Sequence, residues 1–124
     1  MNVKIKTVNG DARKNLIYIC SPLRGNYHAN ILIARQYCRD VIRLRSDAIP
    51  IAPHVFFTQF LDDEKPKERE LGMDMGLVLL EKCSEVWVFG IDQPSEGMMR
   101  EIRYARELGI PVYDALEMYK PKKE

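Results

Sequence analysis

Short, continuously apolar runs alternate with helix-forming segments along this chain, and this alternation constrains its fold more than any other feature. The β-prone runs cover residues 16–20, 48–52, 85–90 and 112–113. Between them, apolar residues recur every three or four positions, as they do on the buried face of a helix. Strands that alternate with helices in this way form a parallel sheet, since each helical crossover brings the chain back to the same edge.

The segments between the strands predict where the helices begin and end. Three helices are expected, over residues 28–44, 63–83 and 97–108. Asp63 is placed to cap the second of these, with Pro66 in its first turn. The segment 53–63 is expected to be a long loop, and Pro50 indicates an edge strand or an irregular start of the second strand. Residues 3–8 alternate weakly and could add a fifth strand.

Together these elements predict one α/β domain over residues 1–124, with a core at about 16–114 and a C-terminal tail at 115–124. The fold class is a Rossmann-like or flavodoxin-like three-layer sandwich with a four- to five-stranded, mainly parallel sheet. Ligands of such sheets bind at the carboxyl ends of the strands. The loops that follow three of the strands, at 21–26, 53–60 and 91–97, are therefore expected to meet at a site.

The composition limits the classes of molecule that the protein is expected to bind. A net charge of +1 gives no electrostatic reason to bind a nucleic-acid polymer or a membrane, and no apolar stretch approaches the length of a membrane span. The three cysteines have neither zinc-ligand nor disulfide spacing, and the first residues lack the apolar run of a signal peptide, so we expect a reduced cytoplasmic protein. With two histidines and no clustered carboxylates, we expect neither a metal site nor a cofactor.

Glu101 is the most unusual polar residue of the third predicted helix. Its spacing from Met98 and Ala105 places it on the apolar face of that helix. A carboxylate that faces inward is costly unless it is paired or lies in a cleft. Two interpretations are open at this point, a structural ion pair with Arg24 or Arg103 and a functional group of a cleft.

Other residues expected at the same rim could bind an anion. Ser95 is placed to cap the third helix, and Gly97 would let a ligand approach the first backbone N–H groups, where phosphate is favoured. Arg24 and Gly25 follow the first strand, and an arginine there can clamp a phosphate. Taken singly, these residues are equally compatible with an ordinary helix cap, a surface arginine and, for Tyr18 in the strand, a core tyrosine.

Two motifs, however, carry a resemblance to a known family. Residues 18–25, Tyr-Ile-Cys-Ser-Pro-Leu-Arg-Gly, resemble the opening motif of the nucleoside 2-deoxyribosyltransferase-like superfamily, closest to its 2′-deoxynucleoside 5′-phosphate N-hydrolase branch. Residues 93–101, with the order Ser95, Gly97 and Glu101, resemble the second motif of that branch. The resemblance spans about residues 16–114, which is nearly the whole domain.

The resemblance implies hydrolysis of an N-glycosidic bond, or deoxyribosyl transfer, on a nucleoside or nucleoside 5′-monophosphate. Glu101 would be the nucleophile and Tyr18 would orient it by a hydrogen bond. Asp74 is the candidate for the family aspartate near the sugar or leaving base, although Leu77 holds the position expected for it and the two share a helix face. The candidate substrate- and phosphate-binding residues are Ser21, Arg24, Gly25, His54, Ser95 and Gly97.

Two function classes remain open from the sequence. The first is an enzyme that acts through Glu101, and the second is a module that binds a nucleotide or an ADP-ribose-like ligand without turnover. A redox domain fits less well, since the sequence has no reactive cysteine pair and no phosphate loop rich in Ser and Thr. By the resemblance we also expect a homodimer or homotetramer, in which the phenylalanines at 56, 57 and 60 pack on a neighbouring subunit or stack on a nucleobase.

Overall fold

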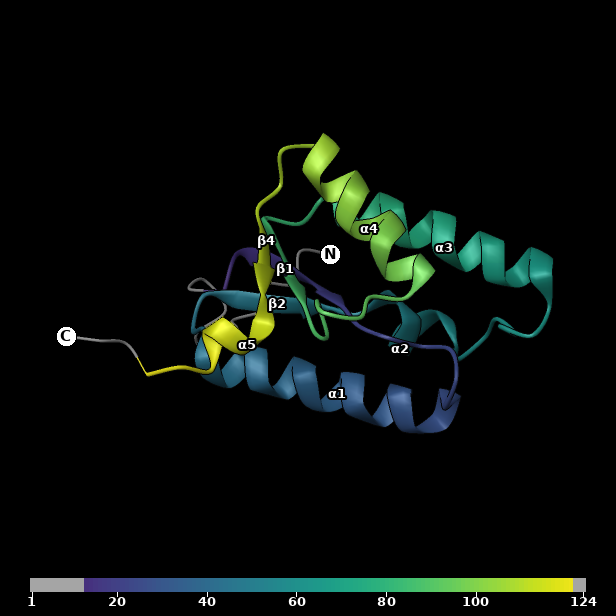
Figure 1. The fold of residues 1–124 in the computed structure, drawn as a ribbon, viewed down its shortest axis with the longest axis horizontal. Helices are drawn as coiled ribbons and strands as arrows, with labels where there is room; N and C mark the ends of the chain where they lie inside the picture. Colours follow the sequence, from purple (N-terminus) through teal and green to yellow (C-terminus); the bar gives the residue numbers. More distant parts are fainter. Residues whose placement is uncertain (1–12, 122–124) are drawn as a thin grey trace, which may run out of the picture.

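The structure is a computed structural model that describes residues 13–121, and its centre is a four-stranded parallel sheet (Figure 1). The strands are β1 (Asn15–Cys20), β2 (Ala48–Ile51), β3 (Glu85–Val88) and β4 (Val112–Asp114), in the spatial order β2-β1-β3-β4. The predicted α/β class with a parallel sheet is therefore confirmed, and β2, which contains Pro50, is an edge strand. The weakly alternating segment 3–8 lies outside the described residues.

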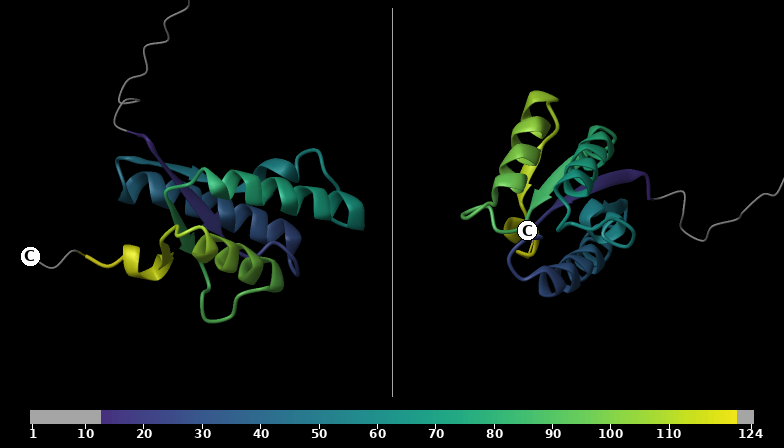
Figure 2. Two further views of the ribbon diagram at one scale, coloured as in Figure 1. Left: turned by 90° about the horizontal axis from the view of Figure 1, so that it is seen from above. Right: turned by 90° about the vertical axis from the view of Figure 1, so that its right-hand side faces the viewer.

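Helices cover both faces of the sheet and produce three layers (Figure 2). They are α1 (Tyr27–Leu44), α2 (Pro53–Phe57), α3 (Pro66–Glu81), α4 (Glu96–Glu107) and α5 (Ala115–Met118). One apolar cluster joins the sheet to α3 and α4, and a second joins the opposite face to α1 and α5. None of these helices is long and apolar enough to cross a membrane.

The side chains of β1 alternate between the two layers. Ile17 and Ile19 belong to the cluster on the α1 side, whereas Tyr18 and Cys20 belong to the cluster on the α3 and α4 side. All four residues are buried because β1 is a central strand that is covered on both faces. The alternation points Tyr18 and Cys20 toward the helix that carries Glu101.

Two expectations about the connections between strands were wrong. Helix α2 occupies the beginning of the predicted long loop, and its five residues are too few to show a helical period in the sequence. Asp63 does not cap α3, because the helix begins at Pro66 and its N-cap position is Lys65, which makes no side-chain cap hydrogen bond. Helix α5 forms within the predicted tail, where the Asp114 carboxylate accepts a hydrogen bond from the Leu116 N–H.

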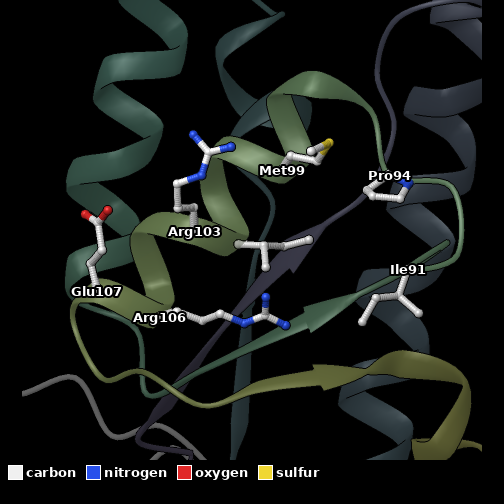
Figure 3. A pocket seen from close by; sticks show the side chains of 7 residues that line it. Ile91, Pro94, Met99, Arg103, Arg106 and Glu107 are labelled. Carbon is white, nitrogen blue, oxygen red and sulfur yellow. The ribbon is translucent and has the colours of Figure 1, made fainter.

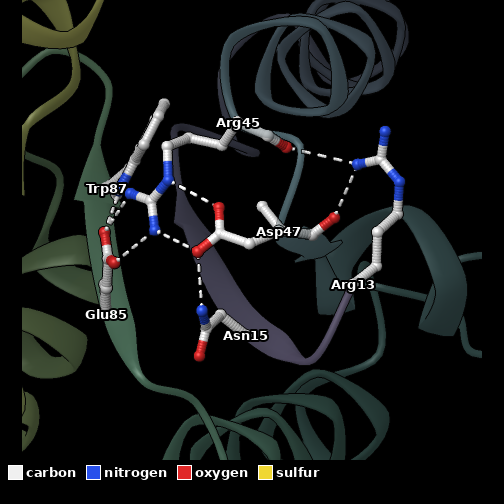
Figure 4. A network of polar contacts seen from close by, with 7 residues as sticks. Arg13, Asn15, Arg45, Asp47, Glu85 and Trp87 are labelled. Atoms are coloured by element: carbon white, nitrogen blue, oxygen red, sulfur yellow. Dashed lines mark hydrogen bonds and ion pairs between the residues drawn. The ribbon is translucent and has the colours of Figure 1, made fainter. Parts of the chain in front are cut away.

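Polar side chains tie the strands together at their amino-terminal ends (Figure 4). The guanidinium group of Arg45 donates to Asp47 at 2.8 and 3.0 Å and to Glu85 at 3.0 and 3.2 Å. Asn15 donates to Asp47, and the buried indole of Trp87 donates to Glu85 at 2.8 Å. Because this network joins β1, β2 and β3 at one end of the sheet, the carboxyl ends of the strands are left for a site.

Candidate active site

A cleft of about 630 Å³ opens beside the carboxyl end of β1, with its walls formed by α2, α3 and α4. Most of the residues singled out in the sequence line it together. They are Tyr18, Ser21, Arg24, His54, Ser95, Gly97 and Glu101. Gly25 and Asp74 do not line it. The three segments that supply these residues follow β1, β2 and β3, as expected for a parallel sheet.

The carboxylate of Glu101 is held by two donors from β1. The hydroxyl group of Tyr18 donates a hydrogen bond to Oε2. The Cys20 sulfur lies 3.9 Å from Oε1 and 3.8 Å from the backbone carbonyl of Met98. Since Tyr18 and Cys20 are two residues apart on one strand face, β1 presents one donor to each carboxylate oxygen. The ion pairs among the described residues do not include Glu101, so the structural ion pair with Arg24 or Arg103, one of the two interpretations left open by the sequence, is not formed.

Burial dominates the electrostatics of this carboxylate. Removal from water raises the pKa of Glu101 to about 7, and the hydrogen bonds from Tyr18 and Cys20, which favour the charged form, offset that rise only in part. Burial and the neighbouring carboxylate also raise the pKa values of the Tyr18 hydroxyl and the Cys20 thiol. Both groups therefore keep their protons near neutral pH and remain donors to Glu101.

A second polar pair lies in the same cleft. The Ser21 hydroxyl and His54 Nε2 are 3.1 Å apart, with Ser21 at the end of β1 and His54 in the first turn of α2. Ser21 is only 7% exposed. Burial lowers the pKa of His54 to about 4, so its imidazole ring is neutral at physiological pH. The Thr58 hydroxyl donates to the backbone carbonyl of His54 at 2.6 Å and fixes this turn.

The amino terminus of α4 opens toward the cleft. The Ser95 hydroxyl accepts a hydrogen bond from the Met98 N–H at 3.2 Å, which confirms the predicted cap. A Cβ atom built on Gly97 would meet no atom within 4 Å, so a ligand has room beside the first turn. Arg24 also lines the cleft and is exposed, and Gly25 next to it adopts a φ of 98°, a left-handed turn that glycine permits.

The structure does not bring Asp74 to the cleft. Its carboxylate is 57% exposed and pairs with Arg100 at 3.1 Å. Leu77, one turn further along α3, lines the cleft instead. The residue identified by the resemblance as the second carboxylate thus does not line the cleft, although its partner Arg100 does.

Sequence reasoning missed Gly76, which sets the distance between α3 and β1. A Cβ atom at Gly76 would lie 3.4 Å from the Tyr18 hydroxyl and 3.6 Å from Cβ of Pro53. The absence of a side chain therefore lets α3 approach the hydroxyl group that orients Glu101. The signal in the sequence was a glycine within a helical pattern, which often marks a close packing contact.

A separate groove of about 580 Å³ lies on the outer side of α4 (Figure 3). Its lining comprises Ile91, Pro94, Met99, Ile102, Arg103, Arg106 and Glu107. It shares Met99 and Arg103 with the cleft but lacks Glu101, Tyr18 and the Ser21–His54 pair. The cleft is therefore the better candidate for chemistry. Among residues 13–121 there is no group of three or more metal-ligating side chains placed to hold an ion.

Comparisons with known proteins agree with this architecture. A 2-deoxyribosyltransferase from the psychrotolerant bacterium Bacillus psychrosaccharolyticus has a similar structure, with a TM-score of 0.55 and 18% identity over 78% of this chain and 69% of that one. That similarity supports the fold class. Residues 15–115 match the model of a family described as a domain of unknown function, DUF7768, and the chain belongs to that family. No curated protein matches the chain significantly.

Glu101 and His54 make opposite contributions to the pH dependence of stability. The folded-state pKa of Glu101, about 7, exceeds its ordinary 4.5, so the folded protein binds more protons between these values and the contribution of Glu101 to stability is lost as pH rises. The folded-state pKa of His54, about 4, lies below its ordinary 6.5, so the unfolded chain binds more protons and stability rises with pH.

We predict that single substitutions reveal these two opposite effects of pH on the free energy of unfolding. Relative to the wild type, the free energy of unfolding of Glu101→Gln should rise by roughly 2 kcal/mol between pH 4.5 and 6.5. That of His54→Gln should fall by a similar amount over the same window. Urea denaturation at several pH values measures both differences, and differences that change in the same direction would contradict the assignment.

Proposed function

We propose that this cleft cleaves the N-glycosidic bond of a nucleoside or nucleoside 5′-monophosphate and passes the sugar to water or to an acceptor base. The observation that carries the proposal is the Glu101 carboxylate, which faces the cleft, is held by the Tyr18 hydroxyl and the Cys20 thiol, and has no cationic partner among the described residues. Such a carboxylate is free to stabilise, and then to bond to, a sugar carbon that becomes positive as its base departs.

The reaction follows the two steps of retaining glycosyl transfer. In the first step one Glu101 oxygen attacks the anomeric carbon, the C–N bond breaks, and its electron pair leaves with the nucleobase. In the second step water or an acceptor base attacks the same carbon, and the electron pair of the sugar–carboxylate bond returns to Glu101. The two donors of β1 hold the carboxylate plane in place, which favours attack through a defined oxygen.

The cleft also offers groups for the rest of a nucleotide. Arg24 on one rim and the open first turn of α4 at Ser95 and Gly97 are suited to a 5′-phosphate. Phe57 and Leu77 provide an apolar wall for a base. The similar solved structure supports this assignment of substrate class, since that protein is a 2-deoxyribosyltransferase that serves as a biocatalyst for the synthesis of nucleosides.

A second candidate function is nucleotide binding without turnover. The position of Asp74 favours it, because that carboxylate does not line the cleft and is paired with Arg100, which does line it. The ligand would be held by the same rim residues, and Glu101 would then contact the sugar by hydrogen bonds alone.

A panel of nucleosides and their 5′-monophosphates separates the two functions. We predict that the wild type releases free base from at least one of them and that Glu101→Gln lowers the rate at least ~100-fold, because a carboxamide cannot form the glycosyl bond. Glu107→Gln is the matched control, since Glu107 lies on the same helix in the outer groove. Chromatography of the released base measures the rates. Tight nucleotide binding with no base release would support the binding function instead.

We also propose a homodimer or homotetramer. Phe56 and Phe60 are 63% and 58% exposed, and the centroids of their rings are 5.3 Å apart. The adjacent Phe57 lines the cleft. A second copy that covered these rings would bury apolar area at the mouth of the cleft. Light scattering at micromolar concentration should give at least the mass of a dimer, and Phe56→Ser with Phe60→Ser should lower it. A strictly monomeric wild type would contradict the proposal.

A further inference from the structure

The Ser21–His54 pair lies close to the nucleophile proposed above. Pro53 directly precedes His54 and packs near Gly76, where a Cβ atom would lie within 3.6 Å of Pro53 and 3.4 Å of the Tyr18 hydroxyl. That hydroxyl in turn donates to Glu101. Pro53 and the Tyr18 hydroxyl therefore both lie against Gly76, and the imidazole and the carboxylate line one cleft from different elements.

The departure of an ordinary nucleobase requires a proton, because the base leaves with the electron pair of the C–N bond. The other charged groups that line the cleft are Arg24, Asp63, Glu68, Arg69, Glu96, Arg100 and Arg103. Glu68 is engaged by the Asp62 N–H and by Lys65, and Glu96 is exposed on the first turn of α4. Asp63 lies in the segment between α2 and α3, and no side chain among the described residues is hydrogen-bonded to its carboxylate. His54 is the acid–base group that a buried side chain, Ser21, holds in one orientation.

We propose that His54 is the proton donor to the departing nucleobase and that Ser21 is the residue that positions its imidazole ring. This inference rests on the proposed function. As Glu101 bonds to the anomeric carbon, the C–N electron pair moves to the base and a ring N–H proton of His54 is transferred to a nitrogen of that base. When water later attacks the anomeric carbon, its proton returns to His54 and the Glu101 carboxylate is restored, so protons and electrons balance over the cycle.

The two residues would then work as a pair that shares one proton. The reactive form needs Glu101 ionised and His54 protonated. Because the pKa values are about 7 for Glu101 and about 4 for His54, the shared proton lies mainly on Glu101, and the reactive form is a minor species. The fraction of this form is constant between the two pKa values and falls outside them. We therefore expect kcat/KM for an ordinary nucleotide to be bell-shaped, with limbs near pH 4 and 7. A base that departs without a proton requires only the Glu101 carboxylate, so its kcat/KM should rise through about pH 7 and then stay level.

The test compares guanosine 5′-monophosphate with its N7-methyl derivative, each with ribose and deoxyribose and each corrected for spontaneous cleavage. Methylation at N7 makes the base cationic, so it departs neutral and needs no proton. His54→Gln should lower kcat/KM for the unmethylated nucleotide at least ~100-fold and change the methylated one less than about threefold. Ser21→Ala should give a smaller loss with the same selectivity. The control is His28→Gln, since His28 is exposed on α1 and should be without effect.

Cleavage of the methylated nucleotide also reports that each variant is folded. Equal losses on both nucleotides, or no loss on either, would overturn the assignment of His54 while leaving the proposed function intact. If the wild type cleaves neither nucleotide, nor any member of the nucleoside panel, the proposed function itself fails and the inference falls with it. A level pH profile for the unmethylated nucleotide above pH 7 would likewise overturn the assignment.

Discussion

The burial of one carboxylate between β1 and α4 is the interaction on which the rest of the site depends. Glu101 lies on a helix face that otherwise packs into the core with Met98, Ile102 and Ala105. Burying a charge there is unfavourable, and the two donors from β1 compensate for it only in part, which is why the pKa of Glu101 rises to about 7. Burial thus raises the affinity of the carboxylate for a proton, while the position of β1 determines its orientation and limits that rise.

That strand is held in place by interactions at both of its ends. The Arg45 network joins β1, β2 and β3 at their amino-terminal ends, and Gly76 lets α3 pack against the Tyr18 hydroxyl. The carboxyl ends of the strands carry no comparable network of ion pairs among the described residues. The sheet therefore combines one end fixed by charged side chains with another end where loops, helix termini and isolated polar groups surround a cleft.

Periodicity in the sequence predicted the strands, the sandwich and the inward direction of Glu101, because these follow from spacing along single elements. It did not predict α2 or α5, whose five and four residues are shorter than a useful helical period. Periodicity also did not predict the contacts between elements. The Ser21–His54 pair depends on β1 and β2 being neighbours in the sheet. The position of Asp74 depends on the rotation of α3 about its axis, which could not be deduced from the fact that Asp74 and Leu77 share a helix face.

The most direct test of this account is the pKa of Glu101 in the folded protein. Carbon-13 NMR of protein labelled at the glutamate side-chain carboxyl carbons would follow each group through a pH titration, and Glu101→Gln would identify the signal by its absence. The account predicts one carboxyl resonance that titrates near pH 7 and disappears in the variant. A Glu101 resonance that titrates near 4.5, like an exposed glutamate, would contradict it.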